Sequence, residues 1–143
     1  MTELNLRTIQ RYQSLKIAFA RLITVIDKLD MDGVQDMMRD SLIQRFEFTI
    51  ELCWNLQRDI AVDLGFLDVI GPKPAIQKAF EIGIIGDFEI WKSMLKSRNL
   101  TSHTYNEEQS IDISKSIVNV YNPEITKFIK TIETKFDLKY EPK

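Results

Sequence analysis

The chain has 143 residues, of which 44% are hydrophobic and 28% charged, with five glycines and four prolines. This composition is typical of an ordinary globular protein, so we expect a single domain over residues 1–143 and no disordered region. The net charge of −2 argues against a surface that binds nucleic acid everywhere, but it allows a local basic site.

Cysteine usage and the N-terminus indicate a cytoplasmic protein. Cys53 is the only cysteine, so the chain cannot form a disulfide within itself. The first residues, MTELNLRTIQ, lack the basic, apolar and small-residue succession of a signal peptide. No apolar run approaches the roughly 18 residues of a membrane span, so we expect no membrane segment.

Two long amphipathic helices are predicted in the first half of the chain. From about Leu6 to Leu29, apolar residues recur at spacings of three and four, which is helical periodicity. The second helix, about Val34 to Leu64, has a period of about 3.5 residues, typical of a bundle seam. Its seam residues are Leu42, Phe46, Thr49, Cys53, Leu56 and Ile60.

Charged residues on the second helix suggest pairing rather than metal binding. Arg45 falls among apolar residues, and a buried guanidinium is costly, so it needs a carboxylate or polar partner from another helix or subunit. Glu47 and Glu51 could together bind a cation, but we expect them to remain solvated near Arg58. No Glu-x-x-His motif completes a carboxylate metal pair. We therefore predict no metal and no cofactor.

The middle of the chain contains a short helix and then a longer one. Gly65 can end the second helix in a left-handed conformation, and Pro74 can begin a short helix that Gly83 stops. Asp87 is a good N-cap for the next helix. On that helix four residues share one face, which should be buried: Trp91, Met94, Leu95 and Arg98.

The last helical region begins after Asn106, which can form a capping box with Gln109. Pro123 should kink this helix or make it restart, and the tail from Leu138 should fray. No run alternates as a strand does. The predicted fold is all-α, an antiparallel four-helix bundle with an additional short helix.

Residues 98–105, RNLTSHTY, form the densest cluster of reactive side chains and include the only histidine, His103. Arg98 is a fixed cation and His103 can exchange a proton near neutral pH, a combination that suits a phosphate or phosphodiester. Lys92 and Lys96 could add local positive charge or could belong to a solvated face. The alternative is structural: Arg98 pairs with a carboxylate and His103 caps a helix.

On one continuous helix, the side chains of Arg98 and His103 would point in different directions. His103 is rotated by roughly 140° from Arg98 on an ideal helix, so one continuous helix cannot aim both at one atom. Either the helix breaks between them, which Asn99 and Ser102 favour, or a second chain completes the pair. We predict a break together with a homodimer whose interface includes the helix that carries Trp91, Met94 and Leu95.

RNLTSHTY, with its Arg-x-x-x-x-His-x-Tyr pattern, resembles the signature of the HEPN superfamily. The chain is similar above all to nucleotidyltransferase substrate-binding proteins, or HepT, which accompany a minimal nucleotidyltransferase. The likeness extends to RFEFTIELCW (45–54), to the segment from Pro72 to Ile85 and to DFEIWKSMLKSRNLTSHTY (87–105). The resemblance implies the same helical-bundle fold.

The resemblance implies two alternative functions. In the first, the chain is the toxin of a toxin-antitoxin pair, a metal-independent ribonuclease in which Arg98 and His103 meet across a dimer cleft. Asn99 and Ser102 would support the site or bind nucleotide, and Tyr105 would accept AMP from the partner nucleotidyltransferase. In the second, the same residues hold a nucleotide or another substrate for that transferase without cleavage. The chain lacks the Gly-Ser and spaced acidic residues that the resemblance would require of a nucleotidyltransferase. The sequence does not identify which RNA or which nucleotide would bind.

Overall fold

The computed structural model describes residues 2–29, 36–101 and 106–139, and their fold is all-α as predicted. The elements in chain order are β1 (Thr2–Glu3), α1 (Leu6–Lys28), α2 (Asp36–Asp63), α3 (Pro72–Glu81), α4 (Phe88–Thr101), α5 (Glu107–Ser116), the π-helical segment η1 (Ile117–Tyr121), α6 (Asn122–Lys135) and β2 (Phe136–Asp137). Among these residues no helix is long and apolar enough to cross a membrane.

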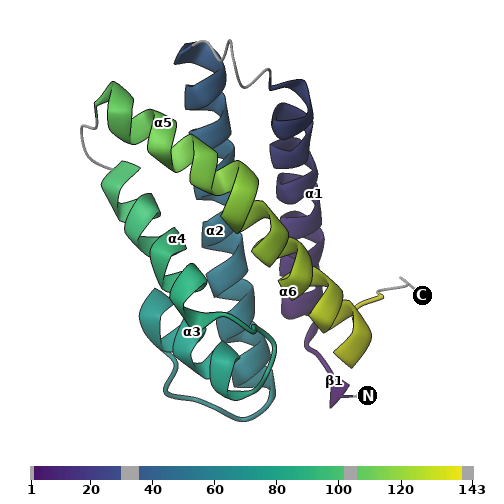
Figure 1. The fold of residues 1–143 in the computed structure, drawn as a ribbon. Helices are drawn as coiled ribbons and strands as arrows, with labels where there is room; N and C mark the ends of the chain where they lie inside the picture. Colours follow the sequence, from purple (N-terminus) through teal and green to yellow (C-terminus); the bar gives the residue numbers. More distant parts are fainter. Residues whose placement is uncertain (1, 30–35, 102–105, 140–143) are drawn as a thin grey trace.

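The helices form an antiparallel bundle around α2. Figure 1 shows α1, α2 and α4 running in alternating directions, with the continuous α5–η1–α6 rod crossing them obliquely and the short α3 at one end. α2 contacts α1, α3, α4 and α5, which explains why it is the helix with apolar residues on more than one side. The four principal helices and the short fifth one of the predicted bundle are therefore confirmed.

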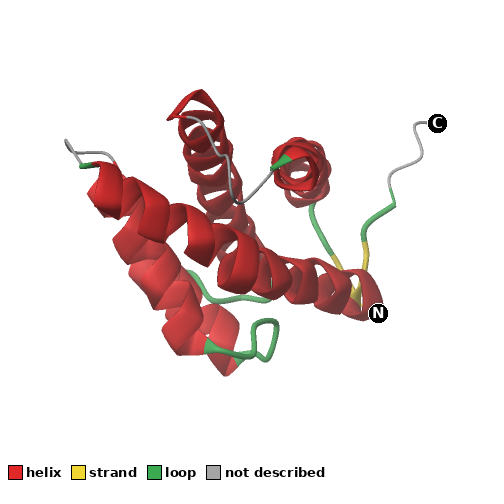
Figure 2. Ribbon diagram, turned by 45° about the horizontal axis from the view of Figure 1, so that its top comes forward, coloured by secondary structure: helices red, strands yellow, loops and turns green. Residues whose placement is uncertain are grey.

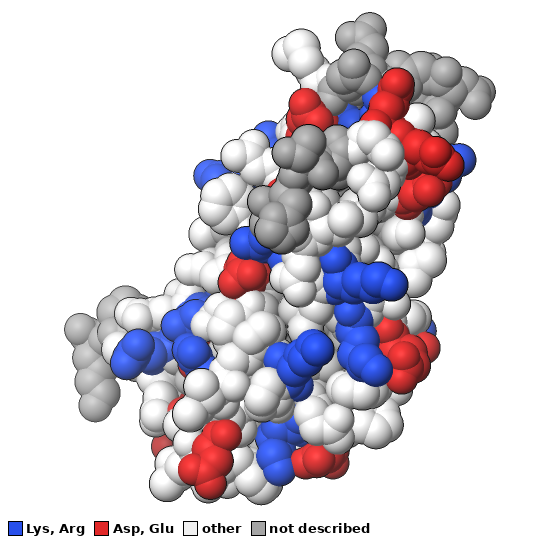
Figure 3. All heavy atoms as spheres, turned by 90° about the vertical axis from the view of Figure 1, so that its left-hand side faces the viewer, with Lys and Arg blue, Asp and Glu red and all other residues white. Residues whose placement is uncertain are grey.

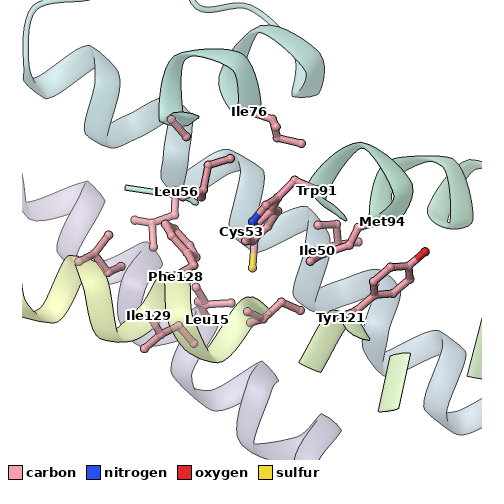
Figure 4. Packing of buried hydrophobic residues seen from close by; sticks show 14 of the residues in the cluster. Leu15, Ile50, Cys53, Leu56, Ile76, Trp91, Met94, Tyr121, Phe128 and Ile129 are labelled. Carbon is pink, nitrogen blue, oxygen red and sulfur yellow. The ribbon is translucent and has the colours of Figure 1, made fainter. Parts of the chain in front are cut away.

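The core contains the predicted seam of α2. All six seam residues are completely buried, and Ile43, Ile50 and Ala61 on the neighbouring stripe are buried as well. Figure 4 shows Trp91 of α4 lying beside Cys53 and Leu56 of α2. Its ring meets Phe128 of α6 edge to face, with centroids 5.5 Å apart. Burial raises the pKa of the Cys53 thiol well above its usual range, which disfavours the reactive thiolate at this core position.

Local signals fix most of the helix boundaries. Gly65 has a φ of 102°, the left-handed value expected after α2. The backbone N–H of Ile90 donates to Asp87 Oδ1 at 3.1 Å, and the capping box of Asn106 and Gln109 is complete. α3 begins at Pro72, two residues before the predicted Pro74, because the turn at Gly71 already places Pro72 at the first helical position.

The predicted disruption at Pro123 takes the form of a π-helical segment one turn earlier. The N–H of Asn122 donates to Ile117 O, five residues back, and α6 continues directly from this turn with Pro123, which has no N–H to donate. The wide turn keeps Ile113, Ile117, Tyr121 and Ile125 on the buried side. On a regular α-helix, residues spaced four apart would move around the helix by about 40° at each step.

The segment that follows α6, up to residue 139, is better anchored than its sequence predicts. β1 and β2 pair in parallel, with Thr2 opposite Phe136, and Figure 2 shows these short strands side by side near the end of α6. Phe136 and Leu138 are buried, so the fraying predicted from Leu138 is wrong for residues up to 139.

A polar contact also ties α1 to α6, where the Tyr12 hydroxyl donates to Glu133 Oε2 and Lys16 pairs with the same carboxylate at 3.2 Å. Partial burial, and then the hydrogen bond to Glu133, raise the pKa of Tyr12 to about 12.

Candidate functional site

The buried face predicted for α4 is confirmed. Trp91, Met94 and Leu95 are buried in the core of their own chain, and Arg98 follows one turn later with 26% of its side chain exposed. The three apolar side chains are therefore not available to a second copy. Our reason for placing the motif helix in a dimer interface was wrong, because helical periodicity does not distinguish contacts within a chain from contacts between chains.

Arg98 is held by two carboxylates of α2. Its Nε lies 3.3 Å from Glu51 Oε1, and its Nη1 lies 3.7 Å from Glu47 Oε2. The expectation that Glu47 and Glu51 stay solvated near Arg58 is therefore wrong. Arg58 instead pairs with Asp59 at 3.2 Å, because it lies further along α2, beyond the level at which α4 presents Arg98.

Glu51 is itself fixed in place. The indole Nε1 of Trp54 donates to Glu51 Oε2 at 3.1 Å, while Glu51 Oε1 faces Arg98. One oxygen is thus used within α2 and the other between α2 and α4, which restricts the guanidinium to one place at the end of α4. The cluster of Glu47, Glu51 and Arg98 carries an excess of negative charge, so an incoming phosphate competes with the carboxylates for Arg98.

Tyr121 of η1 forms hydrogen bonds with the last turns of α4, close to Arg98. Its hydroxyl donates to the backbone carbonyl of Ser93 at 3.1 Å and lies 2.7 Å from Ser97 Oγ, one residue before Arg98. Its ring stacks on Phe46 of α2 with centroids 5.3 Å apart. The π-helical segment therefore positions the tyrosine between α2 and α4 and stabilises the helix end that carries Arg98.

Two further arginines take part in helix contacts. The Arg45 Nη1 donates to Arg21 O of α1 at 2.7 Å, which confirms a polar partner on another helix, although the partner is a carbonyl and not a carboxylate. Arg39, which sequence reasoning missed, is buried and lies 3.3 Å from Glu107 Oε1 at the start of α5. Because its position on α2 has no special spacing, no signal in the sequence distinguishes it.

The remaining predicted site residues are only partly described. Asn99 is exposed on the last turn of α4, and the Thr101 hydroxyl donates to Arg98 O at 2.9 Å. Ser102, His103 and Tyr105 lie outside the described residues, as does the predicted helix break between Arg98 and His103. Within the described ranges no group of three or more His, Cys, Asp or Glu residues could hold a metal ion.

The bundle and its site define a class of protein. The all-α bundle and the position of Arg98 at the end of α4 agree with the class that the sequence resembles, the nucleotidyltransferase substrate-binding proteins. The chain belongs to the family "nucleotidyltransferase substrate binding protein like", whose profile matches residues 10–134.

Relatives support this membership. A probable ribonuclease HepT from Haemophilus influenzae is 35% identical over 89 residues, a match that spans 59% of this chain and 60% of that protein. A solved H. influenzae structure, described as the fold of a substrate binding domain of a nucleotidyltransferase, is 24% identical with a TM-score of 0.71, over 85% of this chain and 98% of that one.

A tri-AMPylated HEPN toxin from Shewanella oneidensis, solved in complex with an MNT antitoxin, is similar in fold. It has a TM-score of 0.72 and 20% identity, and the match covers 92% of this chain and 99% of that one. At this level of identity the similarity establishes a shared fold.

Proposed function

We propose that this protein is the toxin of a two-component toxin-antitoxin system and that it cleaves RNA without a metal. The observation that carries the proposal is the fixed position of Arg98, held by Glu47 and Glu51 at the end of the helix that leads to His103. In this reaction His103 removes a proton from a ribose 2′-hydroxyl or donates one to the leaving oxygen. Arg98 stabilises the negative charge that develops on the phosphate.

The carboxylates give Arg98 a specific role in this mechanism. A guanidinium has five N–H donors, and the ion pairs with Glu47 and Glu51 involve only Nη1 and Nε. The remaining donors are available to a phosphate oxygen without a change in the position of the side chain. Asn99 and Ser102 are proposed to support the site or to bind the nucleotide next to the scissile bond.

A homodimer would complete the site, with Arg98 of one copy and His103 of the other in one cleft. Because Trp91, Met94 and Leu95 are buried, the interface needs another apolar surface, and α1 and α2 provide one. Ile17 and Phe48 are 58% and 63% exposed and line a groove of about 510 Å³ between these helices. Phe48 adjoins Glu47 in sequence, so a second copy seated there would lie next to the Arg98 cluster.

The proposed partner is a minimal nucleotidyltransferase, and the proposed modification site is Tyr105, two residues beyond His103. An AMP group on its phenol would add negative charge and bulk where RNA phosphate must bind, so repulsion and volume would both oppose the substrate. The Shewanella relative is both AMPylated and bound to an MNT antitoxin, which supports this regulation. Because the substrate would be cellular RNA, the proposal places the protein in the cytoplasm.

A second candidate is a non-catalytic subunit that holds a nucleotide or another substrate for a separate nucleotidyltransferase. The family description and the ion pairs of Arg98 favour it, since a guanidinium neutralised by carboxylates binds phosphate less readily. The two candidates share their residues and differ only in whether a phosphodiester bond is broken.

Incubation of the purified protein with a labelled RNA in EDTA distinguishes the ribonuclease from the non-catalytic subunit. We expect wild type to release defined fragments and His103→Ala to release none at the same protein concentration. An uncut RNA in the wild-type lane, with or without added Mg²⁺, would instead favour the binding subunit. Fragments produced equally by His103→Ala would indicate a contaminating nuclease and remove the support for both catalytic roles.

A further inference from the structure

A second feature lies between α3 and α4, on a face the site above does not use. Lys73, Gln77 and Ile76 of α3, with Phe88, Lys92 and Leu95 of α4, line a groove of about 390 Å³. Its floor is apolar, because Ile76 and Leu95 are buried and Phe88 is partly buried. Its two rims carry a lysine each, Lys73 on α3 and Lys92 on α4. The groove therefore combines an apolar base with cations on both sides.

The positive charge continues along α4 towards Arg98. Lys96 is exposed one turn beyond Lys92 on the same side of α4, and these two lysines span about 6 Å of helix at 1.5 Å per residue. Arg98 follows at the end of the helix, where it faces α2. Figure 3 shows Lys and Arg atoms grouped across the middle of the face that contains α3 and α4. Glu89 lies 3.8 Å from Lys92 and is largely exposed, while Glu47 and Glu51 face Arg98. The face is thus locally basic on a chain whose net charge is −2.

Two of these three lysines make no structural contact among the described residues. In the part of the chain that the structure describes, Lys73 and Lys96 have no ion-pair or hydrogen-bond partner for their ammonium groups. Lys92 also lies over the Phe88 ring, with its Nζ 5.3 Å from the ring centroid. Lys78, by contrast, is paired with Glu81 at 2.7 Å and stands outside the groove. Lys73 and Lys96 are therefore available to an anionic ligand, and Lys92 joins them when a phosphate replaces its exposed partner Glu89.

From this placement we infer that the α3–α4 groove binds single-stranded RNA and guides it along Lys73, Lys92 and Lys96 to Arg98. Phosphates pair with the lysines of the rims, and the apolar floor beside Phe88 accepts a base, as basic grooves with aromatic side chains do for single strands. The inference rests on the proposed function, because it takes the RNA to be the substrate of the same site. It adds the residues that bind the strand away from the cleaved bond.

Counterion release gives the expected size of the effect. Each phosphate contact on a single strand contributes about 0.7 to the slope of log affinity against log salt, so three contacts contribute about 2. At about 0.1 M salt the loss of one contact weakens binding about 5-fold, and the loss of three weakens it about 100-fold.

The test measures fluorescence anisotropy of a labelled single-stranded RNA in EDTA with protein carrying His103→Ala, so that the RNA stays intact. The triple variant Lys73→Gln, Lys92→Gln and Lys96→Gln is compared with a control that loses the same charge elsewhere. The control substitutes glutamine for three exposed lysines on other elements, Lys115, Lys130 and Lys139. We expect about 100-fold weaker binding and a salt slope smaller by about 2 for the groove variant, with little change in the control.

Equal weakening in both variants would overturn the inference, because general charge and not the groove would then bind RNA. It is also wrong if the groove variant binds RNA normally but loses its complex with the nucleotidyltransferase, since the face would then be a protein-docking surface. Absence of RNA binding by the parent protein excludes the groove as well. If RNA binding depends on these lysines but wild-type protein does not cleave RNA, the inference about the groove stands. Only the proposed ribonuclease activity is then rejected.

Discussion

Replacement of Arg98 by alanine separates its two roles, in catalysis and in the packing of α4 against α2. The side chain makes two ion pairs, at 3.3 and 3.7 Å, with carboxylates that are themselves partly exposed. Pairs of this kind contribute about 0.2–1 kcal/mol each to stability. Without Arg98, Glu47 and Glu51 also repel each other across one helical turn, at about 0.2–0.5 kcal/mol.

Arg98→Ala should therefore reduce the free energy of unfolding by about 1–2 kcal/mol and lower Tm by about 3–8 °C, while the protein remains folded at 25 °C. Urea titration and thermal melting followed by circular dichroism measure this loss. In a Glu51→Gln background the same substitution should cost about 0.5 kcal/mol less, because the stronger of the two pairs is already absent. RNA cleavage should be abolished in either background.

Arg58→Ala is a matched control. Arg58 is also a partly exposed arginine of this bundle, pairs with Asp59 at 3.2 Å and lies over the Trp54 ring. Its loss should cost a similar free energy and leave cleavage unchanged. If Arg98→Ala protein does not fold, or loses more than about 4 kcal/mol, Arg98 is a structural residue and the catalytic assignment lacks support. Full cleavage by a folded Arg98→Ala protein would contradict the mechanism directly.

Three other predictions concern the surface, the motif and the α1–α6 contact. Phe48→Asp should weaken the homodimer by at least about 100-fold in sedimentation, since each copy loses an apolar side chain, whereas Leu67→Asp, exposed on the loop after α2, should not. Coexpression with the partner nucleotidyltransferase should add AMP to the peptide with Tyr105, as read by mass spectrometry, and Tyr105→Phe should then escape silencing; equal silencing would indicate simple masking. Tyr12 has a pKa raised from 10.0 to about 12, so its contribution to stability is complete below pH 10 and is lost as the pH rises towards 12. Tyr12→Phe should make the pH dependence of the unfolding free energy shallower in that interval, and an unchanged profile would show that the bond to Glu133 has no role.

The sequence predicts those features of the fold that depend on one helix at a time. The seam of α2, the buried face of α4 and the caps at Asp87 and Asn106 follow from spacing and local hydrogen bonding, and the structure confirms them. The contact between Arg98 and Glu51 is of another kind. It depends on the axial shift and rotation of α4 relative to α2, which no periodicity within either helix specifies.

The same reason explains the errors at the site. The sequence indicates that Trp91, Met94 and Leu95 share an apolar face, but the face they pack against is set by the arrangement of five helices. It also indicates an irregularity at Pro123, while the π-helical turn forms at Ile117, where the core contacts of Tyr121 stabilise it. The chemistry of the motif thus singles out Arg98 as a candidate, while the carboxylates that it pairs with could not be predicted from either helix alone.

The π-helical segment also sets the rotation of α6 relative to α5. If the same residues wound as a regular α-helix, α6 would turn by about 100°, because the wide turn holds one residue more than an α-helical turn does. Phe128, Ile129 and Ile132 would then leave the core, and Tyr121 would lose Ser93 and Ser97. Substitutions at the exposed Val120 leave that geometry intact. The wide turn therefore accommodates one residue more than a regular helix could hold with the same side chains in the core, and the end of α4 depends on the tyrosine that this turn positions.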